Sequence, residues 1–167
     1  QLHTRKPPAA AANAAATPPI AGLAHAAATD AIAAAEMAAV RADDHLLAAL
    51  EVADAEFSRA LQTGDVEAEL QANRRFHFTL YEAAQSPTLL SMIRSLWLQS
   101  GPYVRVAVAH HKPEQGAPRT LHHHGLMQAM ADRDAQAARR ELEADLDWAW
   151  RLMQDKVGTP VEGSGSV

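Results

Sequence analysis

Apolar residues recur along this chain at a spacing of three or four positions, and this periodicity most constrains how the chain folds. The longest stripe consists of Leu46, Leu47, Leu50, Ala53, Phe57 and Leu61. Such spacing places side chains on one face of an α-helix, and no segment shows the alternation of a half-buried strand. Apolar residues make up 48% of the 167 residues, but many are alanine and only 5% of the chain is aromatic. Because alanine favours helix and buries little area, we predict an all-α protein with closely packed helices.

Capping and breaking residues divide the chain into about six helices. We predict helices over residues 20–40, 44–63, 66–85, 88–110, 119–132 and 135–157, with boundaries good to about two residues. Asp65 and Asp134 suit N-cap positions, and Gly64 suits a helix C-terminus. Ser86-Pro87 supplies a cap followed by proline at the first helical position. Gly101-Pro102 is predicted to kink the fourth helix, which commonly widens a cavity.

The two ends of the chain differ from this helical domain, which spans residues 20–157. Residues 1–19 form an Ala/Pro low-complexity segment that we interpret as a linker or tail, and residues 158–167 are predicted to be disordered. Residues 112–118, with two prolines and a glycine, are predicted to form a loop. Because the chain begins with Gln1 rather than Met, we expect it to be a processed or excised piece of a longer protein.

Charge and cysteine content narrow the classes of function. The 15 basic and 20 acidic residues give a net charge of −5, a poor balance for a chain that binds nucleic acid by itself. No apolar run is long enough to predict a membrane span. The absence of cysteine fits a reducing compartment, so we expect a cytoplasmic location, and it excludes thiolate metal sites.

Two polar side chains share the core-facing stripe of the third predicted helix. Asn73 and His77 lie one turn apart on the stripe that also carries Leu70, Leu80 and Ala84. A buried polar group must find a partner, or it costs about 1–3 kcal/mol. The stretch from Asn73 to His77 is therefore the strongest candidate for a functional site.

The last two predicted helices add two more inward-facing polar residues. His123 lies eleven residues before Asp134, in the turn between these helices, and Asp145 lies eleven after it. Equal distances from the turn place both at the same height, about 16 Å along the hairpin, and we expect them to face each other. Asn73, His77, His123 and Asp145 together offer two imidazoles and two oxygen donors, which suit Zn, Ni, Mn or Fe. A buried polar network without a metal is the alternative.

Motifs for other chemistries are missing from the sequence. It has no Glu-x-x-His pair of a di-iron bundle, no Gly-rich phosphate loop, no zincin motif and no nucleophile elbow. We therefore predict neither an enzyme nor an organic cofactor. Arg105, just after the Gly-Pro kink, is either a clamp for a carboxylate or a surface arginine. A small metal-dependent helical enzyme and a structural dimerisation module remain the alternative functions.

Short motifs across residues 30–156 resemble the C-terminal effector domain of FadR-type GntR transcription regulators, called the FCD domain. The resembling motifs are Asn73-x-x-Phe76-His77, Tyr81-Glu82-Ala83-Ala84-x-Ser86-Pro87-x-Leu89-Leu90, Leu96-Trp97, Gly101-Pro102, His122-His123, Ala129 and Arg133-Asp134. This resemblance implies an antiparallel helical bundle that binds a small organic acid, often beside a divalent metal held by one Asp or Asn and three His.

Carried onto this chain, the resemblance assigns individual roles. Asn73 stands at the Asp/Asn position, His77 and His123 stand at two histidine positions, and Asp145 replaces the third histidine. We expect Arg105, Tyr103 and His124 to contact the carboxylate effector. The family implies a homodimer that binds operator DNA through an N-terminal winged helix-turn-helix. No such domain fits in residues 1–29, so we expect a ligand-sensing domain that does not bind DNA alone.

Overall fold

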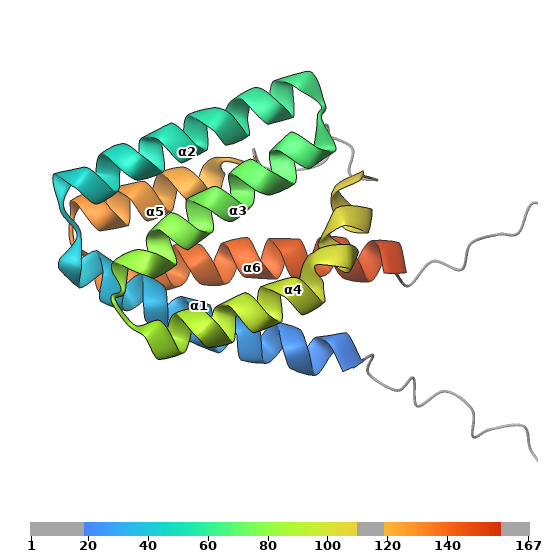
Figure 1. The fold of residues 1–167 in the computed structure, drawn as a ribbon, viewed down its shortest axis with the longest axis horizontal. Coiled ribbons are helices and arrows are strands. Elements are labelled where there is room, and N and C mark those ends of the chain that lie inside the picture. Colours follow the sequence, from blue (N-terminus) through green and yellow to red (C-terminus); the bar gives the residue numbers. More distant parts are fainter. Residues whose placement is uncertain (1–18, 110–118, 158–167) are drawn as a thin grey trace, which may run out of the picture.

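The computed structural model describes residues 19–109 and 119–157, with side chains for residues 28–109 and 119–154. Its helices are α1 (Pro19–Arg41), α2 (Asp44–Thr63), α3 (Val66–Ala83), α4 (Pro87–Ala109), α5 (Leu121–Ala131) and α6 (Ala135–Val157) (Figure 1). Every regular element within these ranges is a helix, which confirms the predicted all-α class and six helices. The predicted tails and the predicted loop lie outside the described residues, apart from Pro19, the first residue of α1. None of the described helices has the length and hydropathy that a bilayer span requires.

Local capping explains why the predicted helix boundaries agree with the structure. The carboxylates of Asp43, Asp65 and Asp134 accept backbone N–H bonds at the starts of α2, α3 and α6, over 2.8, 3.0 and 2.9 Å. These bonds satisfy donors that have no partner within the helix. Gly64 ends α2 with φ of 68°, a left-handed conformation that glycine adopts without strain.

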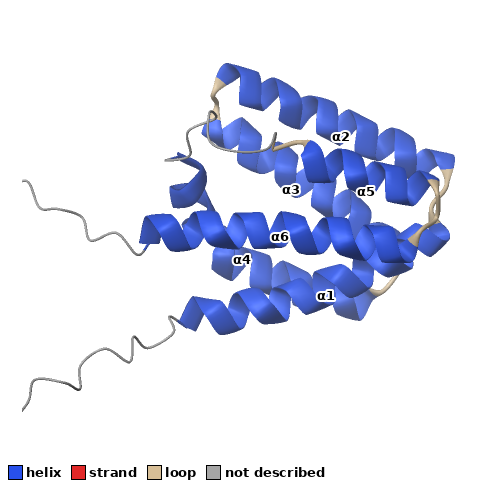
Figure 2. Ribbon diagram, turned by 180° about the vertical axis from the view of Figure 1, so that it is seen from behind, coloured by secondary structure: helices blue, strands red, loops and turns tan. Residues whose placement is uncertain are grey.

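The helices pack in two layers. Figure 2 shows α2, α5, α6 and α1 side by side, and each of these neighbouring pairs is in contact. On the opposite face, seen in Figure 1, α3 and α4 cover this layer. Helix α3 packs on α2, α1 and α4, and α4 packs on α1 and α6, whereas the backbones of α3 and α6 do not pack directly on each other. The space between α3 and α6 is where the site described below lies.

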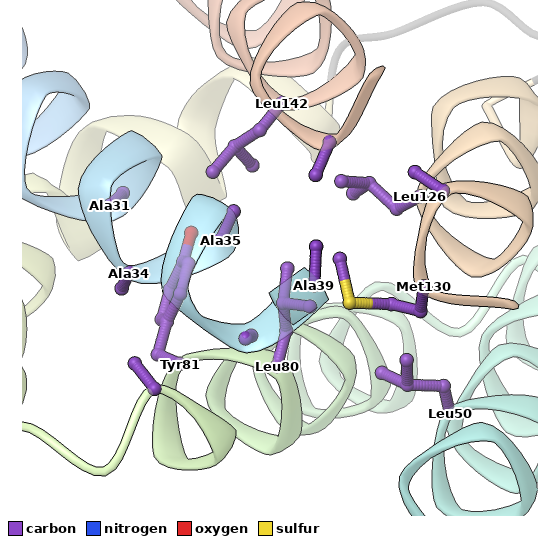
Figure 3. Packing of buried hydrophobic residues seen from close by; sticks show 14 of the residues in the cluster. Ala31, Ala34, Ala35, Ala39, Leu50, Leu80, Tyr81, Leu126, Met130 and Leu142 are labelled. Carbon is purple, nitrogen blue, oxygen red and sulfur yellow. The ribbon is translucent and has the colours of Figure 1, made fainter. Parts of the chain in front are cut away.

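The centre of the bundle is lined by alanines of α1. Ala34, Ala35, Ala38 and Ala39 are completely buried. Larger apolar side chains of the surrounding helices, among them Leu80, Leu126 and Leu142, close around this alanine seam (Figure 3). Because alanine side chains are small, α1 lies close to α3, α4, α5 and α6 at once.

Helix α4 is bent near its C-terminal end. Pro102 lies inside the helix, and the last turns of α4 change direction in Figure 1. A proline in a helix interior removes one backbone hydrogen bond and clashes with the preceding turn. The kink predicted from Gly101-Pro102 is therefore present, and Gly101 lines the cavity between α1, α3, α4 and α6.

Candidate functional site

A cavity of about 590 Å³ lies between α1, α3, α4 and α6. Its polar lining includes Asn73, His77 and Tyr81 on α3 and Asp145 on α6. Trp97 of α4 and Trp150 of α6 add aromatic surface. A mostly apolar cavity of this size with a few convergent polar groups is typical of a small-molecule site.

His77 lies at the inner wall of this cavity and is almost completely buried. Its Nε2 is 3.3 Å from Oδ2 of Asp145, and its Nδ1 is 3.4 Å from the hydroxyl of Tyr81. Burial lowers the pKa of His77 from 6.5 to about 4, although the carboxylate of Asp145 opposes this shift. The imidazole is therefore neutral at pH 7, so His77 does not cancel the charge of an ionised Asp145.

His123 is completely buried deeper in the bundle. Its Nδ1 is 2.9 Å from Oδ1 of Asp54, while its Nε2 is buried without a hydrogen-bond partner. The ring stacks on Phe76 with centroids 3.8 Å apart and planes inclined by 8°, and it lies edge-on to His77 at 5.4 Å. An unpaired buried nitrogen is unusual and calls for a partner that a metal or a polar ligand would supply.

Asp54 of α2, the partner of His123, is a buried carboxylate that the sequence analysis did not single out. It is buried, and its second oxygen lies 3.1 Å from Nε2 of His124. Burial alone would raise its pKa, but the hydrogen bonds and charges of His123 and His124 outweigh burial and bring the pKa below 3.8. Asp54 follows Leu50 by four residues and precedes Phe57 by three, so helical spacing already placed it on the buried face.

The four predicted metal ligands face one region but do not form a single cluster. Asn73 and Asp145 line both the main cavity and an adjoining space of about 50 Å³, whereas His123 lines neither. His123 and Asp145, expected to face each other, have separate partners in Asp54 and His77. Within the described ranges, no three His, Asp or Glu side chains lie close enough to hold a metal ion. Hairpin spacing did not predict the helix that each residue faces.

The predicted effector contacts lie at different places. Arg105 lines the cavity and forms an ion pair with Glu67 across its edge. Tyr103 is 41% exposed and does not line the cavity, and His124 is outside it, next to Asp54. Arg74, which the sequence analysis did not single out, lines the cavity with its guanidinium 4.5 Å from the centre of the Phe78 ring.

A buried ion pair of Glu69 and Arg119 lines the adjoining space. Burial raises the pKa of Glu69, although Arg119 lowers it in part. The Arg119 guanidinium also lies 5.1 Å from the Trp148 ring, and its Nε is buried without a hydrogen-bond partner. Sequence reasoning missed this pair, although Glu69 precedes the buried Ala72 and Phe76 at helical spacing.

Comparison with known families identifies the domain. Residues 31–147, more than half of the chain, match the FCD domain. The chain belongs to the FCD domain family. FCD domains are effector domains of GntR-type transcription regulators and not enzymes, which agrees with the motif resemblance and with the prediction of no enzymatic activity.

Two comparisons point to the same relative of this FCD domain. Over 81 residues it is 27% identical to the HTH-type transcriptional regulator McbR of Escherichia coli (strain K12), covering 48% of this chain and 37% of McbR. The solved structure of E. coli McbR/YncC superposes with a TM-score of 0.77 at 20% identity, covering 83% of this chain and 65% of that one. The fold is therefore that of the McbR FCD domain, and the chain spans less than two thirds of this regulator.

Proposed function

We propose that this FCD domain is the ligand-sensing part of a GntR-type transcription regulator and binds a small organic acid in the cavity between α1, α3, α4 and α6. The observation that carries the proposal is the cavity itself, with its volume of about 590 Å³ and polar groups that converge from α3 and α6. In this proposal Arg105 engages the effector carboxylate by exchanging its contact with Glu67. Tyr103 and His124 would contact the effector from outside the cavity lining.

A divalent metal held by Asn73, His77, His123 and Asp145 is the second part of the proposal. Two imidazole nitrogens and two oxygens suit Zn, Ni, Mn or Fe. The unpartnered Nε2 of His123 and the neutral imidazole of His77 are both suited to donate to a metal. Asp145, where the family usually has histidine, brings a negative charge to the site. A bound metal would supply positive charge for the effector carboxylate.

In the longer protein we propose that this domain acts within a cytoplasmic homodimer. An N-terminal winged helix-turn-helix would bind operator DNA, and effector binding would favour one relative placement of the two DNA-binding domains. The start of α1 and the end of α6 lie at the same end of the bundle as the bent part of α4 (Figure 1). Ala28 and Ala31 of α1 line the cavity, so a change at the cavity can act directly on α1.

Metal analysis of the purified chain tests this proposal most directly. We expect about one tightly bound divalent metal per chain by mass spectrometry, and chelation should lower the melting temperature. A ligand at 100 times its Kd stabilises the native state by about 2.7 kcal/mol. Replacing both His77 and His123 by alanine should abolish binding, whereas replacing the exposed His45 should not. A chain that binds no metal and is stabilised by no organic acid would instead be a structural dimerisation module.

The carboxylate contact needs a separate variant. Organic acids that raise the melting temperature should lose at least about tenfold in affinity in Arg105→Gln, as expected for a charge-assisted hydrogen bond. Arg75→Gln is the matched control, because Arg75 pairs with Glu56 on the surface and does not line the cavity. Equal affinities in the two variants would remove Arg105 from the site.

A further inference from the structure

The walls of the cavity between α1, α3, α4 and α6 are mostly apolar. Large apolar side chains come from three of these helices, namely Leu70 of α3, Ile93 and Trp97 of α4, and Leu146, Trp150 and Met153 of α6. Cavities of about 300–1,000 Å³ typically enclose most of the surface of a drug-sized ligand. A volume of about 590 Å³ therefore leaves room for a ligand with a sizeable apolar body.

The two tryptophans of the lining differ in their surroundings. The ring centroid of Trp97 lies 5.8 Å from that of His77 and 5.3 Å from that of Phe78, so neighbouring rings hold it in place. Trp150 is half-buried and, within the part of the chain that the structure describes, makes no hydrogen bond or ring contact. An indole has a large flat apolar face and one N–H donor. Trp150 is therefore able to pack its ring against a ligand in the cavity.

The charged side chains of the lining limit how many acidic groups a ligand can carry. Among the described residues, three acidic ones line the cavity, Glu67, Asp145 and Asp147, against two basic ones, Arg74 and Arg105. Placing like charges next to each other where water is largely excluded is costly. A ligand with several carboxylates would add to an existing excess of negative charge.

Neither His77 nor a bound metal removes this limit. Burial lowers the pKa of His77 to about 4, so its ring adds no positive charge at pH 7. A divalent metal, as in the proposed function, would turn the excess of one negative charge into an excess of one positive charge. A single carboxylate neutralises that excess. With or without a metal, the lining therefore suits a ligand with one carboxylate better than a ligand with two or three.

The position of Arg105 places this carboxylate at the edge of the cavity. Arg105 and Glu67 form an ion pair there, and the side chains of both are more than half exposed. Ile93 and Met153, in contrast, are buried parts of the lining. A ligand that contacts Arg105 with its carboxylate keeps this group close to water, while its apolar body removes the inner walls from water.

We propose that the effector of this domain is a monocarboxylic acid with an aromatic ring, which packs against Trp150 while its carboxylate binds Arg105. This inference rests on the proposed function, which requires only that a small organic acid binds in the cavity. It excludes citrate-like acids because of their charge. It also excludes acids as short as acetate, because they cover too little of the apolar wall.

The first test titrates the wild-type chain with four probes, phenylacetate, phenylethanol, acetate and citrate, by calorimetry. Phenylethanol lacks the carboxylate, acetate lacks the ring, and citrate has three carboxylates. We expect phenylacetate to bind at least about tenfold more tightly than each of the others, because it alone combines a buried ring with one charge-assisted contact. Equal or tighter binding of any of the other three probes overturns the proposal.

The second test measures phenylacetate binding to Trp150→Leu and Trp148→Leu. Trp148 is the matched control, because it lies on the same helix but lines only the adjoining space of about 50 Å³. We expect Trp150→Leu to lose about three- to tenfold in affinity, as for the loss of an aromatic pair, and Trp148→Leu to change by less than twofold. Thermal denaturation checks that both variants are folded. Wild-type affinity in Trp150→Leu overturns the proposal.

This inference and the proposed function fail in different ways. If citrate or acetate binds and loses affinity in Arg105→Gln, whereas phenylacetate does not bind, the ligand-sensing function stands and the aromatic class is wrong. If none of the three acids binds or raises the melting temperature, both proposals fail.

Discussion

The α1 side and the α3 side of this bundle are both buried, yet they are built from opposite kinds of residue. Helix α1 contributes an alanine seam, Ala34, Ala35, Ala38 and Ala39, with no polar group. Around α3 the interior instead contains buried polar or charged side chains, namely Asp54, Glu69, His77 and His123. The first region is stabilised by close packing, and the second requires every polar group to have a partner.

This difference indicates that the alanine seam is a structural scaffold and that the polar interior around α3 belongs to a binding site. The four alanines of the seam bring the helices close together and do not line the cavity, although Ala28 and Ala31 nearer the start of α1 do. The polar side adjoins a cavity and retains a ring nitrogen without a partner. A folding core gains nothing from such an atom, so the polar side has features of a binding site that packing alone does not explain. The following predictions test this division, starting with the largest effect.

Breaking the buried ion pair should have the largest effect on stability. Glu69→Leu leaves the Arg119 guanidinium buried without its carboxylate, and we expect the free energy of unfolding to fall by about 4 kcal/mol. The double variant Glu69→Leu/Arg119→Met should recover most of this loss, because a buried pair and an apolar pair of similar volume are often equally stable. Urea denaturation measures both. A double variant as unstable as the single one would show that the polar side is needed for folding itself.

The polar side should also make stability depend on pH. His77 has a pKa of about 4 in the folded chain and 6.5 in its ordinary state, so below pH 6.5 the unfolded state takes up a proton that the folded state does not. Stability is therefore fully present above pH 6.5 and should fall by about 3 kcal/mol as the pH drops to 4. Denaturation of the metal-free chain from pH 8 to 4 measures this loss. In His77→Gln the difference between pH 8 and 4 should shrink, and an identical profile would contradict the assignment.

Replacing alanine by a larger side chain should lower the free energy of unfolding in the alanine seam but not at an exposed position. Ala35→Leu adds three carbons where no space is left, and we expect a loss of about 2 kcal/mol in the free energy of unfolding. Ala48→Leu on the exposed side of α2 is the matched control and should change stability by less than about 0.5 kcal/mol. Ala35→Leu should leave the metal affinity of the folded chain unchanged, because Ala35 is neither a proposed ligand nor part of the cavity lining. Equal stability of the two variants would mean that the seam is not tightly packed.

An exposed ion pair provides the smallest effect. Glu56→Gln removes the partner of Arg75 at the surface, and we expect a change below about 0.5 kcal/mol, because solvent screens exposed pairs. Together with Glu69→Leu, this variant compares the same type of interaction in water and in the interior. A loss as large as that of Glu69→Leu would show that burial is not what makes the inner pair important.

Local signals in the sequence were sufficient for the helices and for the buried faces. Caps such as Asp65 and the helix-ending Gly64 act within a few residues, so their effect does not depend on the rest of the fold. The same holds for the kink at Pro102, and for the burial of His77 and His123 on their stripes. The motifs also resembled the FCD family, which the family comparison over residues 31–147 confirms.

Only the tertiary structure decided which buried groups meet. Helical periodicity reports that a side chain faces inward, but not which helix lies opposite. His123 pairs with Asp54, 69 residues away, and His77 pairs with Asp145. The Glu69–Arg119 pair spans 50 residues. These partners depend on how α2, α3, α5 and α6 are placed in the bundle, because a hydrogen bond requires two atoms to lie within about 3 Å.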